Sequence, residues 1–246
     1  MRNNDAITPA RSTAHKTQRL AVIAALMLLL AACGGPGDNA ESAAANAAAP
    51  NTTEHRAPFR LIMLGDSIAA GYGLAADQAL PARLEAALRA RGLAVNIINA
   101  GVSGDTTSDA LARLDWALGT GADGVLIELG GNDLLQGVDP QTTKANLKAI
   151  IERVKAQGLF VLLVGMRAPG NYGAAFAKDF DAIYPALAEG EGIPLYPFLL
   201  EGVATTPSLS QRDGIHPNKD GVNKIVSNLA PFIENAIEKD GRGDLR

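Results

Sequence analysis

The sequence is poor in aromatic residues and nearly devoid of cysteine. Aromatic residues make up 4% of the 246 residues, and the formal net charge is −4. A nucleic-acid surface usually combines a clustered basic stripe with aromatic rings that stack on bases, so we expect no nucleic-acid partner. The only cysteine is Cys33, which excludes an intramolecular disulfide.

Histidine is scarce as well. The chain has three, His15, His55 and His216, and the first two lie in N-terminal segments that we do not expect to fold. Zinc hydrolases usually draw on several histidine or cysteine ligands, and no motif supports an all-carboxylate magnesium site, so we expect neither a metal nor a cofactor. Because histidine is the side chain that titrates near neutral pH without a large shift, His216 is the candidate for proton transfer.

The N-terminal segment has the pattern of a secretory signal. The apolar run Leu20–Leu30 follows Arg11, Lys16 and Arg19 and precedes small residues. This order is typical of a cleaved signal peptide, here residues 1–32. The run is shorter than the about 20 apolar residues that are needed to cross a bilayer.

The string Leu30-Ala31-Ala32-Cys33-Gly34 resembles the lipobox of bacterial lipoproteins. The resemblance implies that Cys33 is lipidated, begins the mature chain and anchors it to a membrane. An ordinary signal peptide with a chance cysteine is the alternative. Because Gly34 is not the aspartate that tends to retain such lipoproteins in the inner membrane, we expect an outer-membrane anchor that faces the periplasm. Residues 33–58 are rich in small and polar residues, and beyond the cysteine we expect a flexible tether.

Residues 59–240 carry apolar runs that alternate with helical patterns, and residues 241–246 are expected to be a C-terminal tail. The predicted strands are Phe59–Leu64, Val95–Asn99, Val125–Leu129, Leu159–Met166 and Leu195–Tyr196. The predicted helices are Ala79–Arg91, Thr107–Leu118, Pro140–Gln157, Ala174–Glu189 and Lys219–Lys239. Near-continuous apolar strands separated by amphipathic helices indicate an α/β domain with a parallel sheet covered on both faces.

Polar strings follow the first three predicted strands. Ser67 lies in Gly65-Asp66-Ser67, Gly101 in Asn99–Asp105, and Asn132 in Leu129–Asp133. A serine can act as a nucleophile, and a glycine N–H or an asparagine amide can donate to an oxyanion. Each string alone also fits a helix N-cap or an ordinary turn. Their shared position at the carboxyl ends of strands favours a joint site.

A fourth string, Asp213-Gly214-Ile215-His216-Pro217, precedes the last predicted helix. The spacing allows the Asp213 carboxylate to hold one ring nitrogen of His216 while the other nitrogen faces a nucleophile. An exposed loop is the alternative interpretation. Asp66 and Asp133 are rival carboxylates, and we prefer Asp213 because it alone is tied to the histidine by local spacing.

Together the four strings resemble the blocks of the SGNH hydrolases, also called the GDS(L) lipases and esterases. The blocks appear in order as GDSIAAGYG, NAGVSGDTT, ELGGNDLLQG and DGIHPN, and the resemblance extends from Phe59 to about Ile237. It is closest to the bacterial periplasmic thioesterase, arylesterase and lysophospholipase branch. The resemblance implies a flavodoxin-like three-layer α/β/α sandwich with a five-stranded parallel sheet.

The resemblance also implies a role for each residue. Ser67 would be the nucleophile, His216 the general base and Asp213 its orienting partner. The oxyanion hole would use the backbone N–H groups of Ser67 and Gly101 and the amide of Asn132. Residues near the blocks could line an acyl groove, and these are Tyr72, Leu134, Leu135, Arg167, Pro169 and Tyr172. We expect Trp116, in a predicted helix, to pack in the fold.

These expectations describe a serine hydrolase of carboxylic ester or thioester bonds. Its substrate would be a small acyl ester or a lysophospholipid, as for an arylesterase, lysophospholipase or thioesterase. A carbohydrate O-acetylesterase on the same fold is the alternative enzyme. A catalytically silent lipoprotein that binds lipid or glycan is the alternative from another class.

Overall fold

A computed structural model describes residues 57–242 and 245. The predicted signal peptide, the predicted lipidation site Cys33 and nearly all of the predicted tether lie outside these residues. Within the part of the chain that the model describes, no helix is both long and apolar enough to cross a membrane.

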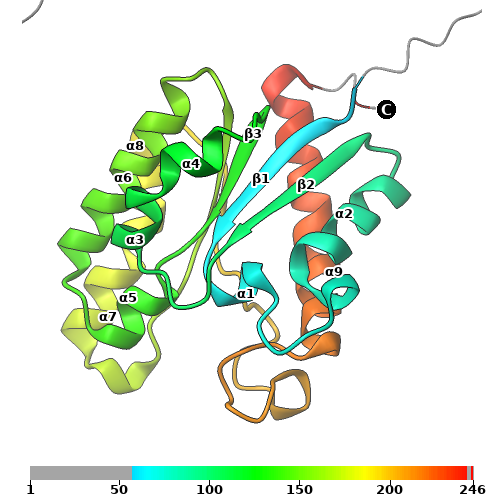
Figure 1. The fold of residues 1–246 in the computed structure, drawn as a ribbon. Helices are drawn as coiled ribbons and strands as arrows, with labels where there is room; N and C mark the ends of the chain where they lie inside the picture. Colours follow the sequence, from blue (N-terminus) through cyan, green and yellow to red (C-terminus); the bar gives the residue numbers. More distant parts are fainter. Residues whose placement is uncertain (1–56, 243–244, 246) are drawn as a thin grey trace, which may run out of the picture. The chain divides into compact units, whose positions relative to one another are not determined.

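A parallel five-stranded sheet forms the centre of the domain (Figure 1). Its strands are β1 (Phe59–Gly65), β2 (Val95–Gly101), β3 (Gly124–Glu128), β4 (Phe160–Val164) and β5 (Leu195–Tyr196). They are arranged in the order β2-β1-β3-β4-β5. This is the flavodoxin-like order, so the predicted fold is confirmed.

Helices cover both faces of the sheet (Figure 1). One face carries α2 (Leu80–Ala90) and α9 (Lys219–Ile237), and the other carries α3 (Thr107–Ala112), α4 (Leu114–Leu118), α6 (Pro140–Lys155) and α8 (Ile183–Glu191). The remaining helices are α1 (Ser67–Ala70), α5 (Gly131–Gln136), α7 (Ala174–Asp181), the 3-10 turns η1 (Ala76–Gln78), η2 (Gly170–Tyr172) and η3 (Pro207–Leu209), and the π-helical η4 (Glu238–Arg242). The central strands β3 and β4 are buried along their whole length because helices lie on both sides.

Two of the predicted helices are broken in the structure. The helix predicted over 107–118 divides at Arg113, whose ψ of 5° leaves the helical region. The Arg113 side chain turns away from the helix to donate to Asp105 at 2.5 Å and to the Gly65 carbonyl at 3.1 Å. The helix predicted over 174–189 divides before Pro185, which has no N–H to continue the hydrogen-bond ladder.

Three further features differ from the sequence predictions. The short helices α1 and α5 were not predicted, because they are too brief to show an apolar period. Beyond residue 240, in the segment expected to be a tail, Leu245 lies in the core and its carbonyl accepts the Ala94 N–H at 2.6 Å. The side chain expected to pack in a helix, Trp116, is 70% exposed.

Candidate active site

The first and third predicted blocks lie at the point where the strand order reverses. Ser67 opens α1 directly after β1, and Asn132 lies in α5 directly after β3, the neighbouring strand. Strands that run in parallel end at the same edge of the sheet. A crevice forms there because the connections leave in opposite directions, and ligands bind in such crevices.

Local backbone contacts place Ser67 at this edge. The carboxylate of Asp66 caps α1 by accepting the N–H of Ile68 at 3.1 Å. Gly65 is required because a Cβ at this position would lie 2.5 Å from Oε2 of Glu128 and 2.6 Å from Cβ of Ala69. The Ser67 hydroxyl oxygen then lies 2.8 Å from Nε2 of His216.

The loop before α9 holds His216 against Ser67. Nδ1 of His216 lies 2.7 Å from Oδ2 of Asp213. The other oxygen of Asp213 accepts the backbone N–H groups of Ile215 at 2.9 Å and of His216 at 3.0 Å. The side chain of Asn218 caps α9 by accepting the N–H groups of its second and third residues, which fixes where the loop ends.

The electrostatics of the loop favour an ionised Asp213. Partial burial raises the pKa of this carboxyl, but the His216 ring and the two backbone N–H groups together outweigh it and lower the pKa to about 2. Asp213 is therefore charged at neutral pH and would stabilise a protonated His216 ring. The ring of Tyr72 lies beside that of His216, with centroids 4.6 Å apart.

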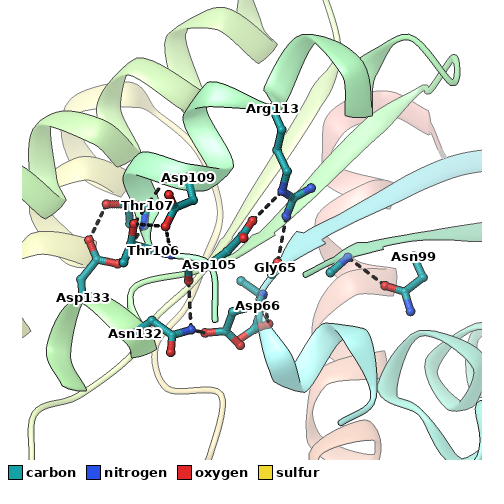
Figure 2. Close-up of polar contacts among 12 residues, drawn as sticks. Gly65, Asp66, Asn99, Asp105, Thr106, Thr107, Asp109, Arg113, Asn132 and Asp133 are labelled. Atoms are coloured by element: carbon teal, nitrogen blue, oxygen red, sulfur yellow. Dashed lines mark hydrogen bonds and ion pairs between the residues drawn. The ribbon is translucent and has the colours of Figure 1, made fainter. Parts of the chain in front are cut away.

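The two rival carboxylates take other partners. Asp133 is buried and accepts three hydrogen bonds. Thr107 donates its backbone N–H at 2.8 Å and its hydroxyl at 2.5 Å, and Thr143 donates its hydroxyl at 3.2 Å. Asp133 therefore ties α5 to α3, as Figure 2 shows, and through Thr143 also to α6. Asp66 is buried beneath Ser67, and burial raises its pKa to about 6 against the lowering effect of the Ile68 N–H.

The amide of Asn132 joins the blocks together (Figure 2). Its nitrogen donates to Oδ2 of Asp66 at 3.3 Å and to the backbone carbonyl of Asp105 at 2.9 Å. Arg113 holds the Asp105 carboxylate from the opposite side. Asn132 is thus fixed between the loops that follow β1 and β2.

The structure does not bring the N–H of Gly101 to this crevice. Gly101 ends β2, packs against the backbone of Ala70, and donates its N–H to the side chain of Asn99 at 2.9 Å. It does not line the cavity, whereas Ser103 and Gly104 of the same block do. The sequence does not show that β2 extends to Gly101, so it could not indicate which glycine of this block faces the cavity.

A cavity of about 700 Å³ opens over Ser67 and His216. Five of the six predicted pocket residues line it, and these are Tyr72, Leu134, Leu135, Arg167 and Pro169. The sixth, Tyr172, does not, because its ring stacks on Phe176 at 5.8 Å. The prediction missed the wall that follows β5, which is formed by Phe198, Leu200, Val203, Ala204 and Thr205. The apolar residues after Tyr196 were the available signal for it.

No group of three or more histidine, cysteine or acidic side chains that could hold a metal occurs within residues 57–242 and 245. The crevice contains a hydroxyl, an imidazole and a carboxylate in hydrogen-bonded sequence, those of Ser67, His216 and Asp213. Such an arrangement can activate the hydroxyl as a nucleophile.

Known proteins are similar to this chain in sequence and in fold. The model of the GDSL-like Lipase/Acylhydrolase family matches residues 63–223. The chain is 41% identical over 181 residues to the thioesterase 1/protease 1/lysophospholipase L1 of Escherichia coli (strain K12), covering 73% of this chain and 86% of that protein. It is 42% identical over 176 residues to an arylesterase of Vibrio mimicus, covering 71% of this chain and 88% of the relative.

A solved structure supports the same relationship. The crystal structure of TesA superimposes with a TM-score of 0.69 at 38% identity, and the match covers 72% of this chain and 99% of that chain. The family match begins within β1 and extends into α9, so it includes all four blocks. The chain therefore belongs to the GDSL-like lipase/acylhydrolase family and is a hydrolase of ester bonds, as its sequence motifs predict.

Proposed function

We propose that this protein hydrolyses acyl esters through a covalent intermediate on Ser67. The observation that carries the proposal is the continuous contact from the Ser67 hydroxyl to His216 at 2.8 Å and from His216 to Asp213 at 2.7 Å. His216 removes the hydroxyl proton as Ser67 attacks the carbonyl carbon, then gives it to the leaving oxygen. Water repeats the attack on the acyl-enzyme and releases the acid. Asp213 holds the ring and stabilises its protonated form.

The oxyanion that forms in each step needs donors in the same crevice. The backbone N–H of Ser67 can donate to it, because the first residues of a helix have no intrahelical acceptor. Asn132 can donate through its amide, exchanging its long contact with Asp66 for one with the oxyanion. We assign the third donor to the N–H of Gly104, which lines the cavity, in place of Gly101.

Labelling with a fluorophosphonate tests the serine mechanism. The wild-type domain is expected to be labelled, and Ser67→Ala is expected to abolish labelling. Ser103→Ala is the matched control, because Ser103 lines the same cavity but has no contact with His216. A domain that is not labelled, or labelling that survives Ser67→Ala, would refute the proposal and favour a silent binding protein.

The lining of the cavity favours acyl chains over acetylated sugars. Its walls are mostly apolar, and three exposed apolar side chains, Tyr72, Leu135 and Ile215, lie among the residues that line it. Among the residues that the structure describes, Arg167 is the one lysine or arginine that lines the cavity, and its guanidinium lies 5.3 Å from the ring centre of Phe198. An apolar groove with one cation fits an acyl chain that carries an anionic head group, such as that of an anionic lysophospholipid.

A pair of substrates with the same acyl chain tests this choice. Arg167→Gln is expected to lower kcat/KM for an anionic lysophospholipid about tenfold. The kcat/KM for the monoacylglycerol with the same acyl chain is expected to stay unchanged. Lys178→Gln removes the same charge from an exposed position on α7 outside the cavity and serves as the control. Equal losses on both substrates, or higher activity on acetylated sugars than on acyl glycerols, would overturn the lysophospholipid assignment.

We also propose that the enzyme is exported and anchored through Cys33. The support is the apolar run and the lipobox-like string Leu30–Gly34. Cells fed radiolabelled palmitate are expected to label the full chain but not Cys33→Ser, and fractionation is expected to place the labelled protein in the outer membrane. Release of an unlabelled, soluble protein would instead support an ordinary signal peptide.

A further inference from the structure

An acidic residue that the proposed mechanism does not use lies directly behind the nucleophile. Glu128 is the last residue of β3, pairs in register with Gly65 and is fully buried. Its Oε2 accepts the backbone N–H of Asp66 at 3.4 Å. Its other oxygen is buried and has no hydrogen-bond partner among the described residues. A carboxyl in this state is costly to bury and needs an explanation.

Glu128 is packed against the turn that presents Ser67. A Cβ on Gly65 would lie 2.5 Å from Oε2 and 2.9 Å from the carbonyl oxygen of Glu128. The carboxyl therefore packs against the Gly65–Asp66 peptide, and Glu128 is not among the residues that line the substrate cavity. Any shift of this side chain would move the backbone that carries the nucleophile.

A second buried carboxyl, that of Asp66, lies beside it. The charged and titratable groups around the pair are Asp105, Asp133, Tyr184, His216 and Arg113. Arg113 contacts the carbonyl of Gly65 but forms its ion pair with Asp105, and among the described residues no cation forms an ion pair with Glu128. Burial, followed by the charge of Asp66, raises the pKa of Glu128 well above its ordinary value, and the N–H groups of Asp66 and Ala69 offset this only in part.

We propose that Glu128 is a positioning residue that acts as a neutral carboxylic acid and supports the Gly65–Ser67 turn from behind. As a neutral group it accepts the Asp66 N–H without repelling the Asp66 carboxylate. Asp66 can then cap α1 and hold the amide of Asn132. An ionised Glu128 would add a second buried negative charge behind the oxyanion and oppose the transition state. The inference about activity rests on the proposed serine mechanism.

Two variants distinguish a role of Glu128 as a neutral hydrogen-bond acceptor from a role in packing alone. Glu128→Gln keeps the shape and the acceptor, so its kcat and KM are expected to stay within about twofold of wild type, and its pH profile of kcat/KM is expected to superimpose. Glu128→Leu removes the acceptor, so its kcat is expected to fall on the order of 10–100-fold with KM unchanged. Leu126→Ala, a buried change in the same strand, controls for a general loss of stability. Its kcat should equal that of wild type when both are measured well below the melting temperature of the variant.

Infrared spectroscopy measures the protonation state without relying on turnover. At neutral pH the wild-type spectrum is expected to contain the carbonyl stretch of a protonated carboxylic acid, and Glu128→Gln is expected to lose it. The inference would be overturned by any of three results: no such band in the wild-type spectrum, a shift of the acidic side of the pH profile of kcat/KM in Glu128→Gln, or a wild-type kcat in Glu128→Leu. If Glu128→Leu does not fold, the infrared band and the pH profile of Glu128→Gln test the inference. Wild-type protein with no esterase activity refutes the proposed function, while the band still tests Glu128.

Discussion

Nε2 of His216 lies 2.8 Å from the hydroxyl oxygen of Ser67, although 149 positions separate the two residues in the chain. Ser67 is placed by the end of β1 and the cap that Asp66 provides. His216 is placed by a loop that Asn218 fixes to the start of α9. The contact therefore depends on two separate elements that meet at the carboxyl edge of the sheet, and its chemical role is open to direct tests.

Removal of the imidazole should stop turnover. His216→Ala is expected to lower kcat roughly 10⁴–10⁶-fold on a soluble aryl ester. The reason is that the described residues contain no second histidine that could take the Ser67 proton. Circular dichroism should show an unchanged fold, since the ring lies at the edge of the cavity. Substantial residual turnover near neutral pH would identify a different base.

Truncation of Asn132 should affect rate more than binding. Asn132→Ala is expected to lower kcat by about 10²–10³-fold with little change in KM, because the lost donor acts on the oxyanion. Asn146→Ala is the matched control, since that amide donates to the Thr107 hydroxyl at 3.1 Å away from the cavity. Near-normal turnover of folded Asn132→Ala would remove it from the oxyanion hole.

Asp213 should make stability depend on pH at the acid end. Its pKa of about 2 in the folded protein lies below the ordinary value of 3.8, so folding favours the ionised form. The stabilisation is complete above about pH 4 and is lost as the pH falls through about 2. Urea unfolding should therefore show a difference between wild type and Asp213→Asn that shrinks as the pH falls. A difference that is independent of pH would show that Asp213 is not held as an anion by His216.

A methyl group at Gly65 should destabilise the fold. Gly65→Ala is expected to lower the free energy of unfolding by about 1–3 kcal/mol or more, because the new Cβ would overlap Glu128 and Ala69. Gly190→Ala, within α8 and with no atom within 4 Å of the new Cβ, should instead stabilise by about 0.5–1 kcal/mol. Thermal or urea unfolding of both variants measures the contrast, and equal effects would contradict the close packing at Gly65.

The parts of the fold that depend on local pattern could be read from the sequence. The predicted ends of the strands and long helices lie within two residues of the observed ends, because apolar runs and Pro or Gly stops are local signals. The breaks at Arg113 and before Pro185 were missed, since a long-range ion pair and a single lost backbone donor are weak signals in an otherwise helical pattern. Ser67, Asn132 and His216 of the predicted blocks line one cavity, and from the second block Ser103 and Gly104 line it, whereas Gly101 does not.

The residue types available for chemistry follow from the sequence alone, because it contains one histidine within the predicted domain and a small set of polar strings at strand ends. Which of these groups meet depends on how the strands and helices pack. This packing brought His216 to Ser67, turned the Gly101 N–H to Asn99, and buried Glu128 beneath the nucleophile. The physical reason is that hydrogen bonds and desolvation act over a few ångströms, and the distances between these groups are set by packing between strands and helices far apart in the chain.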